Sequence, residues 1–270
     1  MSVKKMVIDL SGLRRLGIDE IALRKGQENY VVVLVDLDRH EPIGLVASRK
    51  QKEIRAVLEN WGSEVLEQIV EVSIDLSGNY KGLVEKVLPN AVVVADRFHV
   101  MQLVNKELNR AQNRVRRENE SKPESSEKMC IEVALKQSKY ALLKPEEKLT
   151  EKQKLKLEEV RKVSPLLATM HEQKERFRTI FEETDNWLDA TFKLGDWLKE
   201  AQDNYKASTG TIRRWFGEIV GYFENRTTSG VVEGINNRLK LIKRSGYGFR
   251  NFGNFQLRCL MCWHFHIKSA

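Results

Sequence analysis

The sequence predicts an α/β fold: a mixed five-stranded sheet with flanking helices and an all-α insertion. Between residues 16 and 99, short apolar runs alternate with segments of helical periodicity, which is typical of such sheets. From Arg117 to Lys206 the composition changes to Glu, Lys, Gln and Leu with helical spacing and no strand-like run. We therefore predict a core in two parts, residues 1–116 and 207–270, separated by a helical insertion at residues 117–206.

Three apolar runs separated by turn residues predict three antiparallel strands at Leu16–Leu23, Tyr30–Leu37 and Pro42–Ala47. The second run is almost continuous Val and Leu, as expected of a strand that is buried on both faces. Gly26–Asn29 is predicted to be the hairpin turn between the first two strands.

Helix and strand signals then alternate. The spacing predicts, in order, a helix, a strand, a helix, a strand and a long helix, at Glu53–Ile69, Val70–Leu76, Tyr80–Leu88, Ala91–Ala95 and from about His99. Asp75 and Asp96 stand at the ends of the two strands. The order of three strands, helix, strand, helix, strand, helix is that of the ribonuclease-H-like fold.

The charge distribution favours a polyanionic partner. The chain carries 46 Lys and Arg against 38 Asp and Glu, a net charge of +8. In the segment from Arg226 to the C-terminus, Glu233 is the single acid among eight cations. It stands at the start of a predicted amphipathic helix, Val232–Arg244, and shares a polar stripe with Asn237, Lys240 and Arg244.

Three cysteines without framework spacing argue against a disulfide scaffold and for a reducing cytoplasm. The chain opens with no signal peptide and has no apolar run of membrane-spanning length, so we expect a soluble cytoplasmic protein. Cys259, Cys262, His264 and His266 could bind zinc, but they lie in an apolar, helix-like tail. We therefore interpret the cysteines as buried free thiols.

Three carboxylates from distant parts of the chain could hold two divalent ions if the fold brings them together. The strand that holds Asp19 is expected to lie beside the parallel strand that ends in Asp75, so the two acids can meet at one edge. Asp36 and Asp38 end an antiparallel strand and should emerge at the opposite end. Glu20 is the nearest alternative to Asp19, and each acid alone could be an ordinary strand-end residue facing water.

Several blocks of the chain resemble the ISL3 family of bacterial insertion-sequence transposases: Leu16–Glu20, Tyr30–Arg39, Asp75–Tyr80, Leu88–His99, Gly230–Arg244 and Gly246–Phe252. The resemblance implies a catalytic Asp-Asp-Glu triad, carried here by Asp19, Asp75 and Glu233, with a helical insertion between the second and third acids. It also implies two divalent metal ions, magnesium or manganese, and metal-dependent cleavage and strand transfer of DNA.

Asp96 and His99 look like an Asp-x-x-His element that related transposases carry after the second catalytic acid. The pair could orient a metal ligand or touch DNA phosphate. A helix cap with a histidine packed beside it is the alternative, and the sequence leaves both interpretations open.

DNA is the expected partner, at transposon ends and at the target, with the protein nucleoid-associated and acting as a homo-oligomer on DNA. The predicted phosphate and base contacts are Arg238, Lys240, Lys243, Arg244, Tyr247 and Arg250. Family members look longer, with a DNA-binding region ahead of the catalytic domain. We see no paired-Cys or recognition-helix pattern before Asp19 and expect that region to be missing. Two alternatives remain: an inactive remnant that only binds DNA, and a nuclease of the same fold.

Overall fold

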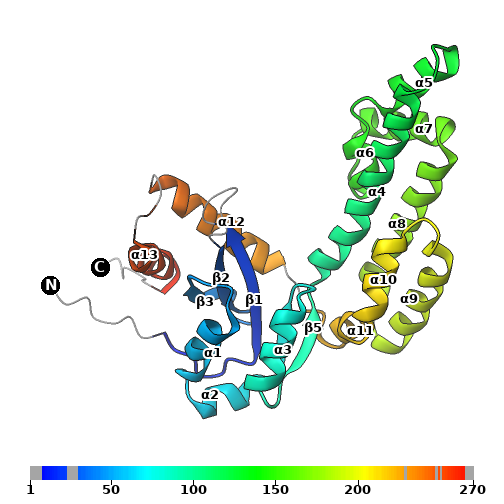
Figure 1. Ribbon diagram of the computed structural model, residues 1–270. Coiled ribbons are helices and arrows are strands. Elements are labelled where there is room, and N and C mark those ends of the chain that lie inside the picture. The colour runs from blue at the N-terminus through cyan, green and yellow to red at the C-terminus, as the bar shows by residue number, and fades with distance from the viewer. Residues whose placement is uncertain (1–7, 23–29, 228–229, 247–248, 250, 265–270) are drawn as a thin grey trace. The chain divides into compact units, whose positions relative to one another are not determined.

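The computed structural model describes residues 8–22, 30–227, 230–246, 249 and 251–264 (Figure 1). The chain forms two compact units, residues 1–98 with 225–270, and residues 99–224. These boundaries differ from the predicted ones at 116/117 and 206/207. The first differs because a single helix, α4 (Arg97–Glu120), continues across the predicted boundary and gives nearly all its length to the second unit.

The first unit, here the sheet unit, contains a five-stranded sheet in the order β3-β2-β1-β4-β5. Its strands are β1 (Arg15–Ala22), β2 (Tyr30–Asp36), β3 (Glu41–Val46), β4 (Glu71–Ile74) and β5 (Val92–Ala95). β2 pairs antiparallel with β1 and β3, whereas β4 is parallel to both β1 and β5. The predicted mixed five-stranded sheet is confirmed. The predicted turn at Gly26–Asn29 lies outside the described residues.

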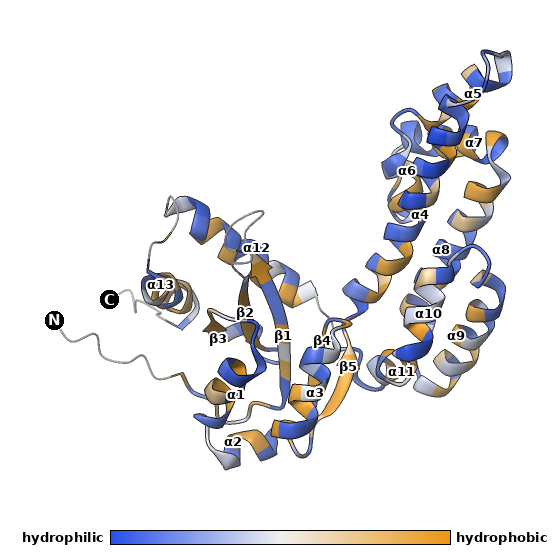
Figure 2. Ribbon diagram, viewed as in Figure 1, coloured by the Kyte–Doolittle hydropathy of each residue, from blue (hydrophilic) through white to orange (hydrophobic). Residues whose placement is uncertain are grey.

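Helices cover both faces of this sheet. Val31, Val33 and Val35 of β2 share a buried cluster with apolar residues of α12 (Gly230–Ser245) and α13 (Phe252–His264). On the other face, α1 (Gln51–Glu59) contacts β3, and α3 (Gly78–Val87) contacts β4. Figure 2 shows the apolar and polar stripes of α12. β2 is therefore apolar on both sides because both sides are covered.

The prediction of a single helix over Glu53–Ile69 is wrong. The chain forms two helices there, α1 and α2 (Ser63–Gln68), and Gly62 between them has a φ of 89°. A backbone with positive φ cannot continue a right-handed helix, and glycine adopts it without steric cost. Leu58 and Leu66, on either side of the break, are both buried, so the apolar spacing continues across it.

The second unit, here the helical unit, contains α helices and one 3₁₀ turn and has no strand among its described residues, so the predicted helical character is confirmed. After α4 its helices are α5 (Ser126–Leu135), α6 (Lys139–Leu143), α7 (Glu151–Val163), α8 (Pro165–Glu183), α9 (Trp187–Ala201), α10 (Lys206–Arg214) and α11 (Phe216–Asn225). No helix in the described part of the chain combines the length and apolar character needed to cross a membrane.

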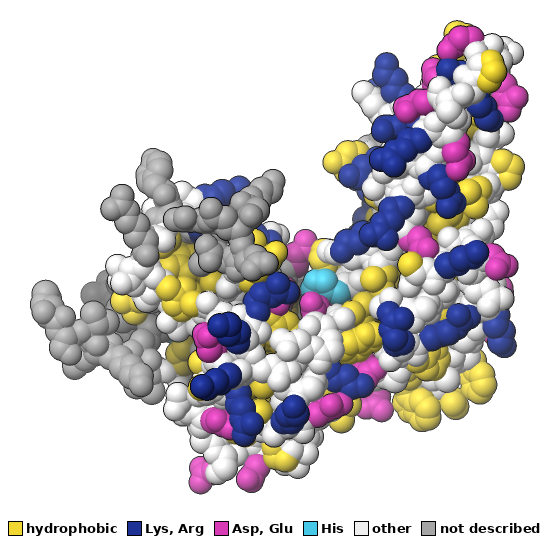
Figure 3. Space-filling model, viewed as in Figure 1, with side chains coloured by type: hydrophobic (Ala, Val, Ile, Leu, Met, Phe, Trp, Pro, Cys, Tyr) yellow, Lys and Arg dark blue, Asp and Glu magenta, His cyan; other side chains and the backbone are white. Residues whose placement is uncertain are grey.

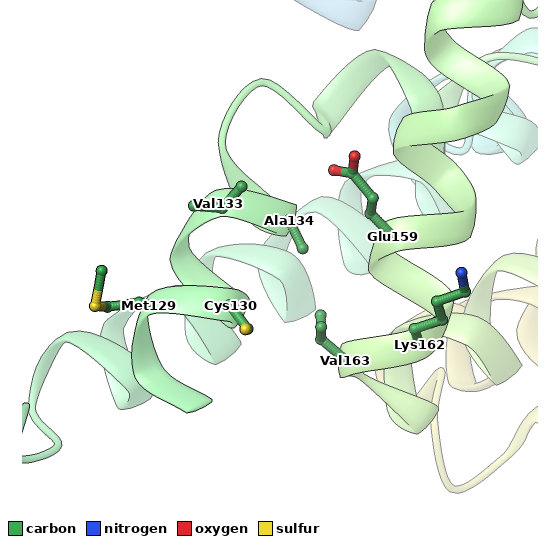
Figure 4. Close-up of a pocket in the computed structure, with 7 residues that line it drawn as sticks. All are labelled: Met129, Cys130, Val133, Ala134, Glu159, Lys162 and Val163. Carbon is green, nitrogen blue, oxygen red and sulfur yellow. The ribbon is translucent and has the colours of Figure 1, made fainter. Parts of the chain in front are cut away.

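Aromatic side chains build the core of the helical unit. Phe177 contacts Phe181 and Trp197, with ring centroids 5.2 and 4.4 Å away. The Trp197 indole N–H donates to the backbone oxygen of Gln173 at 2.7 Å, so its polar atom is satisfied inside the core. A separate apolar hollow of about 430 Å³ lies between α5 and α7 (Figure 4).

Candidate active site

Asp19 lies in β1 on the face of the sheet that α12 covers. The side-chain amide of Asn236 in α12 donates to Asp19 Oδ2 at 2.6 Å, and the backbone N–H of Glu20 donates to Asp19 Oδ1 at 2.7 Å. The carboxylate is half-buried. Because successive strand residues point to opposite faces, Asp19 and Glu20 belong to different sides of the sheet.

Asp75 follows the last residue of β4 and stands beside Asp19 in the parallel register. Ile18 pairs with Ile74, so the next residue along each chain is Asp19 on one strand and Asp75 on the other. Neighbouring strands are about 4.8 Å apart. The two acids therefore occupy adjacent positions at the same edge of the sheet.

α12 runs along β1 in the same direction. Val232 packs against Gly17, Asn236 contacts Asp19, and Lys243 Nζ donates to the backbone oxygen of Ala22 at 3.3 Å. A Cβ atom at Gly17 would lie 2.9 Å from Leu37 Cδ2 and 3.4 Å from Val232 Cγ2, so a larger residue there would require the Leu37 side chain to shift.

Glu233 is exposed in the first turn of α12, three residues before Asn236. Residues spaced this way are neighbours on a helix surface, about 5–6 Å apart at Cβ. Glu233 therefore lies one helical turn from the amide that contacts Asp19. Within the described residues, no three His, Cys, Asp or Glu side chains gather closely enough to hold a metal ion, so Glu233 does not complete a three-carboxylate cluster in this structure.

Glu20 is engaged on the opposite face. It accepts hydrogen bonds from the Tyr80 hydroxyl and from Arg49 Nε, the latter at 2.9 Å. Burial, followed by the hydrogen bond to Glu20, raises the pKa of the Tyr80 hydroxyl, and the charge of Asp75 adds to the rise. Glu20 is thus part of a charged, hydrogen-bonded network on the side of α3.

Asp36 and Asp38 lie at the other end of β1. Asp36 pairs with Leu16, three residues before Asp19, as the antiparallel arrangement predicts. Its buried carboxylate accepts the backbone N–H groups of Asp38 and Arg39, both at 2.9 Å, and so closes the turn after β2. Asp38 Oδ1 accepts a hydrogen bond from Arg15 Nε at 2.6 Å.

Asp96 lies next to Asp75 at the same end of the sheet, and its carboxylate caps a helix. Its backbone N–H donates to the oxygen of Ile74 at 2.7 Å, which places it beside Asp75 on the next strand. Its carboxylate is buried and accepts the N–H of Phe98 at 2.7 Å, in the first turn of α4. This contact supports the helix-cap interpretation of Asp96. His99 lies in the same turn and is the first residue of the helical unit.

Asn236 is a residue that the sequence analysis missed. It is 5% exposed, and its Oδ1 has no hydrogen-bond partner among the described residues. The available signal was a polar residue three positions after Glu233 on a predicted helix. Two adjacent asparagines obscured it, because Asn237 was assigned to the polar stripe with Glu233. In the structure Asn237 is exposed and Asn236 faces the sheet.

Glu71 was also missed. This buried carboxylate opens β4 and accepts hydrogen bonds from the Asn225 amide, at 2.6 Å, and from the Thr227 hydroxyl. Asn225 and Thr227 belong to the segment that leads back into the sheet unit ahead of α12. Glu71 therefore anchors the chain just before the helix that carries Glu233.

The predicted DNA-binding cations of α12 have different environments. Arg238 lies over the Trp263 ring, with Cζ 4.3 Å from the centroid, and donates to the backbone oxygen of Cys262 at 3.0 Å. It thereby connects α12 with α13. Lys240 and Arg244 are exposed. Tyr247 and Arg250 lie outside the described residues.

The cysteines of α13 also differ. Cys259 is a buried free thiol, and burial raises its pKa to about 12, whereas Cys262 is an exposed free thiol. A ring nitrogen of His264 lies 2.8 Å from the backbone oxygen of Pro42. His266, the fourth member of the Cys/His cluster, lies outside the described residues.

Comparisons with known proteins identify relatives over most of the chain. A transposase family model of the ISL3 type matches residues 16–259. The transposase for insertion sequence element IS1001 of Bordetella parapertussis is 27% identical over 93% of this chain and 61% of its own length. The transposase for IS1557 of Mycobacterium tuberculosis (strain CDC 1551 / Oshkosh) is 28% identical over 92% of this chain and 60% of its own length.

The chain thus spans about three fifths of the length of these curated relatives. No solved structure matches it.

Proposed function

We propose that this chain, which belongs to the ISL3 family of insertion-sequence transposases, carries the catalytic centre of a DNA transposase. The centre would cleave DNA strands at transposon ends and join the freed 3′ hydroxyl to target DNA. One observation carries the proposal: Asp19 and Asp75 end up side by side on parallel strands, and α12, which bears Glu233, is fastened to Asp19 through Asn236.

The donor chemistry of this edge fits hard divalent cations. Asp19 and Asp75 offer carboxylate oxygens, and the buried Asn236 Oδ1 is an amide oxygen without a hydrogen-bond partner among the described residues. We assign Asp19, Asp75 and Glu233 as the residues that would hold two ions, magnesium or manganese. Such ions, when bound, stabilise the charge on the reacting phosphate and activate the attacking hydroxyl.

The protein's own groups position the carboxylates. The Asn236 amide and the Glu20 backbone N–H fix the orientation of Asp19. The role that we give Glu233 requires its exposed side chain to turn toward Asp19 in the loaded complex.

The exposed cations of α12 would serve DNA. Lys240 and Arg244 follow Glu233 on the same helix and would neutralise phosphates that the carboxylates would otherwise repel. The homo-oligomer on DNA is part of the same proposal.

A plasmid nicking and strand-transfer assay tests this function. The purified chain is incubated with supercoiled DNA and Mg²⁺ or Mn²⁺, and the wild type is compared with Asp75→Asn, Glu233→Gln and the control Asp38→Asn. We expect both reactions to be lost in the first two variants and kept in the control. Unchanged nicking by Asp75→Asn and Glu233→Gln would refute the proposed centre. Wild-type nicking without strand transfer would support the nuclease alternative.

A further inference from the structure

α4 has one buried face and one strongly basic face. The helix buries Val100, Val104, Leu108, Ala111, Gln112 and Asn119. Its opposite side carries Lys106, Arg110, Arg114 and Arg117, at positions i, i+4, i+8 and i+11. We name these four residues the α4 cation row. With a rise of about 1.5 Å per residue, the row extends over roughly 16 Å.

The row is exposed and poorly neutralised. All four side chains are exposed. Arg114 reaches Glu118 at 3.9 Å, but Lys106, Arg110 and Arg117 form no ion pair within the part of the chain that the structure describes. The nearby carboxylate of Glu107 is engaged elsewhere, accepting the backbone N–H groups of Ala207 and Ser208 at 3.1 and 2.7 Å.

Many cations of α7–α9, in contrast, are paired with carboxylates. Arg178 contacts Glu147, Glu175 and Glu182. Carboxylates also partner Lys154, Lys156, Arg161, Arg176 and Lys199. Like charges one turn apart destabilise an isolated helix, so the α4 row does not serve the stability of α4. Its free positive charge is available to a partner.

We propose that the α4 cation row binds the sugar-phosphate backbone of double-stranded DNA, giving the helical unit a direct part in DNA binding. The choice of DNA as the polyanion rests on the proposed transposase function. Duplex DNA carries one charge per about 1.7 Å of axis, and cations one helical turn apart can each reach a separate phosphate. Figure 3 shows Lys and Arg side chains gathered along the edge of the helical unit where α4 runs.

The test measures binding without catalysis. A fluorescent 30-base-pair duplex of arbitrary sequence is titrated by anisotropy in EDTA across a salt series. The row variant replaces Lys106, Arg110, Arg114 and Arg117 by Gln. The control variant makes the same charge change at four paired cations, replacing Lys154, Lys156, Arg176 and Lys199 by Gln. Circular dichroism confirms that each variant is folded.

We expect the slope of log affinity against log salt to fall in magnitude by about 3 to 4 in the row variant, since each phosphate contact contributes roughly 0.9. The control should change the slope by less than about 1. A swap variant that keeps all four charges, with Lys106→Arg, Arg110→Lys, Arg114→Lys and Arg117→Lys, should bind like the wild type. Equal slopes for the row and control variants would overturn the proposal, as would a wild-type chain that binds no duplex.

Two further measurements keep the test decisive. If the fourfold variant does not fold, the single reversal Arg110→Glu must still weaken duplex binding, and unchanged binding would overturn the proposal. Duplex binding through the row by a chain that shows no nicking would refute the proposed catalytic function while supporting the row.

Discussion

Two neighbouring carboxylates lie on opposite sides of strand β1 and have different partners. Glu20 faces α3, where the Tyr80 hydroxyl and the Arg49 guanidinium compensate its charge. Asp19 faces α12, where the Asn236 amide donates to it, and Asp75 occupies the neighbouring position on the parallel strand. A compensated carboxylate stabilises the fold, whereas an acid that is oriented beside a second acid can serve chemistry. Residue type alone does not show which of these two kinds a carboxylate is. Its partner on the covering helix does.

The largest expected effect follows from exchanging each acid for its amide. Asp19→Asn removes a proposed ligand charge and should lower the nicking rate by about a thousandfold or more, equivalent to several kcal/mol of transition-state stabilisation. Glu20→Gln keeps the shape of the side chain on the other face and should lower the rate less than tenfold. Single-turnover nicking at saturating Mg²⁺ measures both.

The same two variants also test whether the Glu20 side of β1 takes part in catalysis. Equal losses of rate in two folded variants would mean that both sides of β1 contribute to the site. A severe loss in Glu20→Gln alone would assign the first catalytic acid to Glu20.

A smaller effect is expected at the residue that orients Asp19. Asn236→Ala should lower the nicking rate by about 10- to 100-fold, the usual cost of losing a group that supports a metal ligand. Asn237→Ala, on the exposed side of the same turn, is the matched control. Calorimetric titration with Mn²⁺ separates positioning from folding, because weaker ion binding by a fully folded Asn236→Ala chain is the specific signature. Identical behaviour of the two variants would remove Asn236 from the site.

On the structural side of β1, the expected effect is on stability. Tyr80→Phe removes the hydroxyl that donates to Glu20 and should lower the free energy of unfolding by about 2 kcal/mol, as for hydrogen bonds to charged groups. Tyr140→Phe, at an exposed side chain in α6, should change it by less than about 0.5 kcal/mol. Urea unfolding measures both. A folded Tyr80→Phe chain with lost nicking and unchanged stability would contradict this assignment.

Much of the fold could be predicted because its signals are local. Runs of Val and Ile bounded by turn residues located the strands to within a few residues. The break between α1 and α2 was missed because the positive φ of Gly62 does not disturb the apolar spacing that the sequence displays.

The site was harder to predict because it depends on helical phase and on partners. Asn236 and Asn237 differ by about 100° around α12, and the sequence does not show which of them meets Asp19. Asp96 stands in the same row as Asp75, but its contact with the Phe98 N–H ties it to the start of α4. The sequence pattern does not show where the Glu233 side chain lies. This side chain is exposed, and the ions proposed to attract it are not part of the chain.

At Arg49 we expect a small effect, and on stability only. Its side chain is 55% exposed while it pairs with Glu20, and its guanidinium lies 4.4 Å from the centroid of the Tyr30 ring. Exposed ion pairs contribute about 0–1 kcal/mol and are screened by salt, and an exposed cation–π contact adds about 0.5–1 kcal/mol. Arg49→Gln should therefore lower the free energy of unfolding by about 1 kcal/mol, with a smaller difference in 1 M salt, and leave nicking unchanged. Urea unfolding at two salt concentrations measures the effect, and a double-mutant cycle with Tyr80→Phe measures how strongly the two Glu20 contacts depend on each other. If Arg49→Gln instead slowed nicking as much as Asn236→Ala, the Glu20 side of β1 would belong to the catalytic centre.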